Sequence, residues 1–171
     1  MNQSVLHPKD LVTSMNKTNQ QGFSLVELLI VVAVIGIIAA IAVPNLLASR
    51  RAANEGSAQA SLRTIHTCEA TYRATTGAGS YGTLDDLKGQ FLTDDVLASG
   101  TKSGYSFAAN PLTGGIAAQF YATAVPASTS GVGQSGTRRF AIAEDGVPKG
   151  DLTLTVPADR AEVDSMPAVG N

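Results

Sequence analysis

The hydrophobic pattern along the chain changes sharply at one point. Residues 1–22 are polar and lack periodicity, and the chain turns apolar directly after Gly22. Within residues 23–43 the only clearly polar side chains are Ser24 and Glu27, and Pro44 closes the run. As an α-helix this run would span about 31 Å, roughly the hydrocarbon core of a bilayer. The pattern therefore predicts a helix over residues 23–44 that can cross a membrane.

Residues 45–75 continue the helical pattern in a more polar sequence. A narrow stripe recurs at helical spacing, and we expect it to pack on one face of a sheet; it comprises Ala58, Leu62, Ile65, Cys68, Glu69 and Tyr72. The two halves together predict a helix of roughly 50 residues, about 75 Å long. Because that is too long for a globule of this size, one end must be covered by something else. We expect His66 to face solvent and Cys68 to be a small buried thiol.

Residues 76–171 are expected to form a small head. Glycines break the helix within residues 75–82. Residues 83–87 and 93–97 each begin with a threonine and include two acids, which is typical of an N-cap and the first turn of a short helix. The acidic pairs also raise a calcium hypothesis, but they lack the spacing of a calcium-binding loop, so helix starts are the better interpretation.

The rest of the head alternates as strands do. Alternation is clear in residues 105–109, 120–124 and 140–142, and a last strand is expected over residues 152–156 before a polar tail. Residues 110–115 predict a turn and Asp145-Gly146 a hairpin, with Pro148 placing the following arm at an edge. The prediction is an α+β fold in which three or four antiparallel strands lie across the long helix. Residues 126–137 are expected to form a mobile, exposed loop.

Glu27 is the anomaly of the apolar run. A carboxylate in hydrocarbon costs a few kcal/mol and persists mainly where it has a partner. If the chain were cut between Gly22 and Phe23, the new amino-terminal cation would lie four residues from Glu27 and could pair with it within one helix or across two packed helices. The alternative is an acid near the end of the span that reaches back to the interface.

Small residues share one face of the same run. Gly36, Ala40 and Pro44 are spaced by four, which would let neighbouring helices approach closely in lipid. Pro44 also removes an amide donor and displaces the carbonyl of Ala40. This pattern fits a kinked single-pass anchor, or a segment that loosens between Gly36 and Pro44 when subunits pack.

The stretch GFSLVELLIVVAVIGIIAAIAVP closely resembles the class III signal of type IV pilins and of their pseudopilin relatives. The resemblance implies a pilin-like fold, cleavage after Gly22 by a prepilin peptidase, N-methylation of Phe23, and Glu27 as the acid needed for subunit docking. It favours subunit packing as the role of the Gly36, Ala40 and Pro44 face. The implied partners are further copies of the chain in a helical filament, the peptidase and methyltransferase, the inner membrane and the pilus assembly machinery.

The resemblance also sets the expected domains and location. Residues 1–22 would be a cleaved leader, with Met15 as an alternative start because MNKTNQQG is a short lysine-bearing leader. Residues 23–44 would form the membrane and filament-core helix, residues 45–75 its amphipathic half, and residues 76–171 the head with a flexible C-terminal tail. The subunit would cross the inner membrane once, head outward, before joining an extracellular pilus or a periplasmic pseudopilus.

Other functions remain open at this stage. A pseudopilin of a type II secretion system is the nearest alternative, and a monomeric single-pass binding protein is a third. An ordinary secretory signal cleaved at Ala40-Ile41-Ala42 is disfavoured because the apolar run is too long and contains an acid.

Composition narrows the remaining chemistry. The formal charge of -2 argues against a general polyanion binder, and DNA binding at Arg138 and Arg139 is only a side alternative because no aromatic platform accompanies them. The single cysteine excludes an intrachain disulfide. The two histidines, His7 and His66, lack the companions of a catalytic or metal site, so the sequence predicts no enzyme, no cofactor and no metal.

Overall fold

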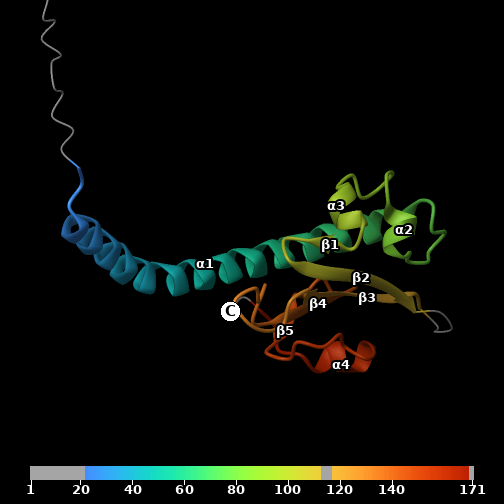
Figure 1. Ribbon diagram of the computed structural model, residues 1–171. Helices are drawn as coiled ribbons and strands as arrows, with labels where there is room; N and C mark the ends of the chain where they lie inside the picture. Colours follow the sequence, from blue (N-terminus) through green and yellow to red (C-terminus); the bar gives the residue numbers. More distant parts are fainter. Residues whose placement is uncertain (1–21, 113–116, 170–171) are drawn as a thin grey trace, which may run out of the picture. The chain divides into compact units, whose positions relative to one another are not determined.

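The computed structural model describes residues 22–112 and 117–169 (Figure 1). The chain divides into two compact units, Met1–Ala40 and Ile41–Asn171, and helix α1 (Leu25–Ala74) contributes to both. The expected leader lies outside the described residues except for Gly22, and so do Met15 and His7.

Helix α1 joins the two predicted helical segments into one element of 50 residues, with Pro44 inside it. Its buried side chains all belong to the second half, and they are Ala58, Ser61, Leu62, Ile65, Cys68 and Glu69. The predicted stripe is therefore confirmed, except that Tyr72 at its end is only half-buried. The helix closes where the Gly77 N–H donates to the carbonyl of Tyr72 at 2.8 Å.

Two one-turn helices follow, α2 (Leu84–Leu87) and α3 (Asp95–Ala98). At α2, Asp86 accepts hydrogen bonds from the Thr83 N–H at 2.8 Å and the Thr83 hydroxyl at 2.7 Å. At α3 the N-cap is Asp94, not the expected threonine, because a carboxylate there accepts from two amides of the first turn at 3.1 Å each. Asp94 also forms an ion pair with Lys102. These bonds support helix starts over calcium ligands as the role of Asp86 and Asp94.

The sheet is an antiparallel meander with the order β1-β2-β3-β4-β5. Its strands are β1 (Thr101–Lys102), β2 (Tyr105–Leu112), β3 (Gln119–Pro126), β4 (Arg139–Ala143) and β5 (Lys149–Asp151). It has five strands, not three or four, because the two-residue β1 is too short to show alternation in the sequence. Strand β2 also runs through the first residues of the expected turn at 110–115, of which residues 113–115 lie outside the described part of the chain.

The hairpin between β4 and β5 is confirmed. Gly146 has φ of +71°, and its N–H donates to the carbonyl of Ala143 at 3.0 Å. Strand β5 lies at the sheet edge, as Pro148 predicted. The expected strand over residues 152–156 is wrong: β5 ends at Asp151, and the side chain of Leu152 is 73 % exposed. Leu152 has no apolar layer to pack against among the residues described, so alternation alone does not make a strand there.

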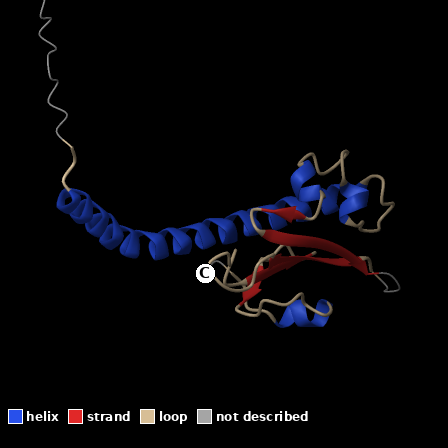
Figure 2. Ribbon diagram, in the orientation of Figure 1, coloured by secondary structure: helices blue, strands red, loops and turns tan. Residues whose placement is uncertain are grey.

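Both faces of the sheet are covered in the second unit (Figure 2). The face toward α1 buries the even-numbered side chains of β3 and β4 against the helix stripe, including Phe120, Ala122, Phe140 and Ile142. The other face buries Tyr121, Ala141 and Ala143 against Val163 and Met166 at helix α4 (Arg160–Ser165). The expected polar tail therefore contains a packed helix.

Arg139 forms the centre of an ion-pair cluster beneath this second face. Its guanidinium donates two hydrogen bonds to Asp151 at 2.9 Å each and one to Glu162 at 2.7 Å, while its side chain is only 4 % exposed. A further bond runs to the carbonyl of Thr155 at 3.0 Å. These partners raise the pKa of Arg139 and lower the pKa of Asp151, and they draw the chain away from the sheet after β5.

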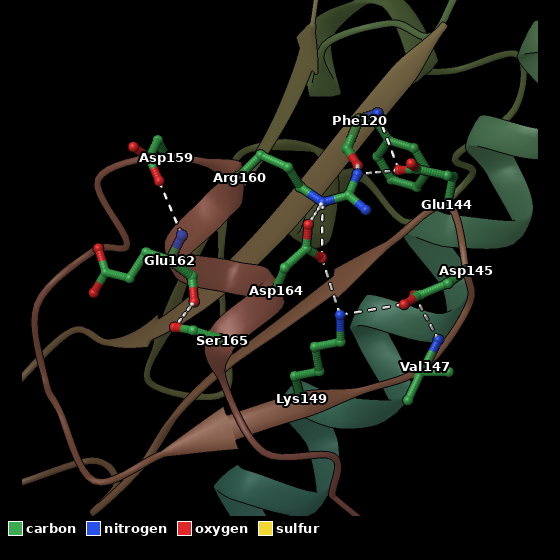
Figure 3. Close-up of polar contacts among 10 residues, drawn as sticks. All are labelled: Phe120, Glu144, Asp145, Val147, Lys149, Asp159, Arg160, Glu162, Asp164 and Ser165. Atoms are coloured by element: carbon green, nitrogen blue, oxygen red, sulfur yellow. Dashed lines mark hydrogen bonds and ion pairs between the residues drawn. The ribbon is translucent and has the colours of Figure 1, made fainter. Parts of the chain in front are cut away.

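Arg160 and Lys149 extend the attachment of α4 (Figure 3). Arg160 pairs with Glu144 at the end of β4 and with Asp164 one turn further along its own helix. Lys149 of β5 bridges Asp164 at 3.1 Å and Asp145 at 3.2 Å. In a chain whose one cysteine excludes an intrachain disulfide, ion pairs together with Val163 and Met166 hold the C-terminal segment on the sheet.

Glu69 is a carboxyl group fully buried in the core. One of its oxygens, Oε2, accepts from the Gly82 N–H at 3.0 Å, while Oε1 has no hydrogen-bond partner among the described residues. Burial raises the pKa of Glu69 to about 7, with a smaller contribution from Asp86. Glu69 therefore holds the segment after α1 against the helix, at the cost of burying an acid.

We expect Glu69 to make the head more stable in mild acid. The pKa lies at about 7 in the folded chain and at 4.5 in the unfolded chain, so this stabilisation is fully present below pH 4.5 and is lost as the pH rises toward 7. The shift corresponds to about 3 kcal/mol. Glu69→Gln keeps an acceptor for Gly82 and should remove this pH dependence, as measured by thermal unfolding between about pH 4.5 and pH 8 in detergent. An unchanged pH dependence would contradict this role.

We also expect Arg139→Ala to destabilise the head by about 3 kcal/mol, because it leaves two partly buried carboxylates without their cation. Denaturant unfolding followed by circular dichroism measures this effect. Arg138→Ala is the matched control, since Arg138 is adjacent and exposed. Equal stability of the two variants would show that the Arg139 cluster does not hold the C-terminal segment.

Candidate functional site

The candidate cleavage position lies immediately before helix α1. Gly22 and Phe23 are outside the helix and exposed, with 82 % of Phe23 accessible. The helix starts at Leu25, and the Leu28 N–H donates to the carbonyl of Ser24 at 3.2 Å. A non-helical, accessible peptide bond is what a peptidase requires, so the local geometry is compatible with cleavage between Gly22 and Phe23.

Glu27 lies in the first turn of α1 and is exposed. A carboxylate at this end of a helix is favoured by the helix dipole. Within the residues described, no hydrogen bond or ion pair reaches Glu27, so the structure does not bring the sequence-predicted cation to it. In hydrocarbon, such a carboxylate needs a cation from its own amino terminus or from another molecule.

The apolar half of α1 exposes nearly all its large side chains. Their exposed fractions run from 47 % at Val31 to 78 % at Leu25. Leu25, Leu28, Leu29 and Val32 border a shallow apolar depression on its surface. Among the described helices, α1 alone is long and apolar enough to cross a membrane. A stable structure requires lipid or other helices to cover this surface.

Gly36, Ala40 and Pro44 are all exposed on this half of the helix. A Cβ added at Gly36 would meet nothing within 4 Å among the described residues, so their packing does not require glycine there. The helix continues through Pro44 without a break. The boundary between the two units falls between Ala40 and Ile41, inside this segment.

The loop after β3, expected to be mobile, is fastened to α1. Arg51 Nε donates to the carbonyl of Gln134 at 3.3 Å, and Asn54 Nδ2 donates to that of Ser135 at 2.8 Å. Glu55 accepts from the N–H and the hydroxyl of Thr137, each at 2.7 Å. No local pattern predicts these contacts, because they join residues about 80 positions apart.

The remaining candidates lie in the head. His66 does not face solvent as expected: it is half-buried, with its ring 6.0 Å from that of Phe120. Cys68 is buried as predicted, and its thiol donates to the carbonyl of Phe91 at 3.1 Å. Arg139 is buried in the ion-pair cluster, so it cannot join Arg138 in a DNA-binding pair. Within residues 22–112 and 117–169, no group of three or more acidic, cysteine or histidine side chains is placed to hold a metal.

Comparisons with known proteins find one family model and two relatives, each matching only part of the chain. A family described as "Prokaryotic N-terminal methylation motif" matches residues 17–43. The "Type IV wide pilus major component PilA4" of Thermus thermophilus is 60 % identical over 37 residues, which cover 22 % of this chain and 28 % of that protein. The "Type IV major pilin protein PilA" of Myxococcus xanthus is 39 % identical over 61 residues, covering 36 % of this chain and 27 % of that protein. No solved structure matches the chain.

The chain thus carries a prepilin-type N-terminal methylation motif and is homologous to type IV pilins. It spans just over a quarter of the length of each of these two relatives. The resemblance found in the sequence is confirmed for this segment. The long apolar helix with an antiparallel sheet is a pilin-like α+β fold. The homologous pilins are structural proteins rather than enzymes.

Proposed function

We propose that this chain is a structural subunit of a type IV pilus filament. The observation that carries the proposal is the methylation motif on a helix whose apolar surface none of the described residues covers. A lone acid stands in the first turn of that helix. Filament assembly would cover the apolar surface with the same helix of neighbouring copies.

Processing would create a cation that can pair with Glu27, for which the described residues supply none. In this proposal a prepilin peptidase cleaves between Gly22 and Phe23, and the new amine of Phe23 is methylated. A methylated amine remains a cation, so it can pair with the Glu27 carboxylate of a neighbouring subunit and fix the stagger between the two helices. The pair offsets the cost of placing each charge in an apolar core.

The Gly36, Ala40 and Pro44 face serves the same assembly. In lipid the hydrophobic effect does not drive helices together, so association depends on close packing. Small side chains allow that close packing. Pro44 leaves the carbonyl of Ala40 without its intrahelical donor, so the helix is easiest to loosen between Gly36 and Pro44. We propose that residues 1–22 form the leader, residues 23–44 the filament-core helix, residues 45–75 its head-bound half and residues 76–171 the head.

The names of the relatives favour a pilus over a pseudopilus. Both homologous proteins are named as major components or major pilins of type IV pili. We propose the corresponding location: the subunit crosses the inner membrane once with its head on the outer side, and then joins an extracellular filament. The assembly machinery at that membrane would supply the remaining partners. A type II secretion pseudopilin shares the same signal and would leave the filament in the periplasm.

The cleavage proposal is tested by Gly22→Ala. The variant should accumulate as a precursor that keeps its leader, whereas the unmodified chain should begin with methylated Phe23, as read by intact mass and N-terminal sequencing from the native cells. Gly36→Ala is the control and should be processed normally, because a Cβ at Gly36 meets no atom of the described residues within 4 Å. A mature chain beginning at Val43 would instead indicate an ordinary secretory signal and refute the filament proposal.

The docking proposal is tested by Glu27→Ala. We expect normal or improved membrane insertion, because an acid is removed from the apolar run, together with loss of incorporation into filaments. Sheared surface filaments and carbonate-washed membranes, probed with the same antibody, separate the two readouts. Ser24→Ala, one turn away, should still assemble. Normal incorporation of Glu27→Ala would refute the charge pair, and filaments confined to the periplasm would favour the pseudopilin.

A further inference from the structure

The polar residues that follow the apolar run have a defined position along the axis of helix α1. Leu47, three residues after Pro44, is the last large apolar residue before the polar half of the helix, and Arg50 and Arg51 occupy the next turn. At 1.5 Å per residue, Arg50 lies about 4.5 Å beyond Leu47 along the helix axis. The polar layer on each side of a bilayer is roughly 5–7 Å thick. If the apolar run crosses a membrane, both arginines lie among the lipid headgroups.

The loop between β3 and β4 lies beside the segment of α1 that carries Leu47, Arg50 and Arg51. Arg51 fastens it by hydrogen bonds to the carbonyls of Gln134 and Gly131. A cavity of about 240 Å³ opens between loop and helix, and Leu47 and Arg50 line it together with Val132 and Gly133. Since Leu47 follows Pro44 by only three residues, the loop would lie close to the membrane boundary if the apolar run crosses a membrane.

The loop exposes an apolar side chain at a position where a polar side chain would be expected in contact with water. Val132 is 75 % exposed, more than any other valine in the described residues. It is flanked by Gly131 and Gly133, both exposed, so no neighbouring side chain covers it. An exposed apolar residue beside arginines at a membrane boundary is typical of an interfacial contact.

The charge of this region is positive. Within the described residues, Arg50 makes no ion pair or hydrogen bond, and Arg51 bonds only to neutral carbonyl oxygens. Glu55 is the nearest acid along the helix, and its Oε1 already accepts two hydrogen bonds from Thr137. Phosphate groups complement this arrangement, because arginine can offer several N–H donors to one phosphate.

We propose that Arg50, Arg51, Val132 and Gly133 form a membrane-facing surface that docks the head on anionic phospholipid headgroups before assembly. Arg50 binds lipid phosphate at the mouth of the cavity, and Val132 enters the interfacial layer. This contact orients the head relative to the membrane before the subunit joins a filament. This inference rests on the proposed membrane-anchored subunit, and it goes beyond that function by assigning a lipid-binding role to the head.

The chain contains no tryptophan, so one introduced tryptophan reports its own surroundings. The full chain carrying Val132→Trp is reconstituted into vesicles of phosphatidylglycerol and phosphatidylcholine with brominated acyl chains. We expect a blue-shifted emission that the bromolipid quenches. The matched control is Val96→Trp, which replaces another exposed valine in α3, outside the proposed surface, and should be unquenched.

Two further measurements separate lipid binding from a change of fold. In the Val132→Trp background, Arg50→Gln should lower the ratio of docked to undocked heads about fivefold in anionic vesicles. This is the effect of removing one cation from an anionic membrane surface. It should have little effect in vesicles of phosphatidylcholine alone. If Val132→Trp disturbs the loop, Gly133→Trp gives a second position, since a Cβ there lies 3.9 Å from Ser128 Oγ.

The outcomes that overturn the inference are distinct from those that overturn the proposed function. Equal emission from Val132→Trp and Val96→Trp, in a chain that resists carbonate extraction, refutes the membrane-facing surface and leaves the anchored subunit intact. A chain that carbonate extracts refutes both. A tryptophan that is unquenched in vesicles but blue-shifted in purified filaments shows that a second copy, rather than lipid, covers this surface.

Discussion

The structure depends on one helix meeting two different environments. The first half of α1 offers large apolar side chains on every side, and the second half offers one narrow stripe. Water is a poor solvent for the first half, so it requires lipid or other helices. The second half supplies one wall of a core in its own chain. The same helix therefore carries both the surface that needs an outside partner and the surface on which the head folds.

The head is organised by the stripe on α1. Leu62 and Ile65 are fully buried with Phe120 and Phe140, which orients β3 and β4 across the helix. That contact fixes one face of the two central strands, and their other face then needs its own cover, which Val163 and Met166 provide. The chain closes this second layer largely with ion pairs. Their contribution falls as carboxylates protonate or salt rises, unlike that of a disulfide.

Glu69 and the loop after β3 show how function and stability share the helix. Glu69 stands in the apolar stripe and fixes the segment after α1 through Gly82. At the other end, Arg51, Asn54 and Glu55 use the polar side of α1 to hold residues 134–137. The head is thus tied to the helix both at its far end and close to the apolar run. This attachment gives the proposed membrane-facing surface a fixed position relative to Leu47.

The sequence alone determined the features that depend on neighbouring residues. Hydrophobic length, the Glu27 anomaly, the stripe from Ala58 to Glu69 and the Asp145-Gly146 hairpin follow from local spacing, and the methylation motif is itself a continuous stretch. Tertiary structure decided the rest. Strands β3 and β4 carry apolar side chains on both faces of the sheet. No local pattern shows that α4 covers the face turned away from α1. Three findings depend on residues that are far apart in the sequence: the burial of Arg139, the half-burial of His66 and the attachment of the loop by Arg51. Only the packing of the sheet and the helix brings those residues together.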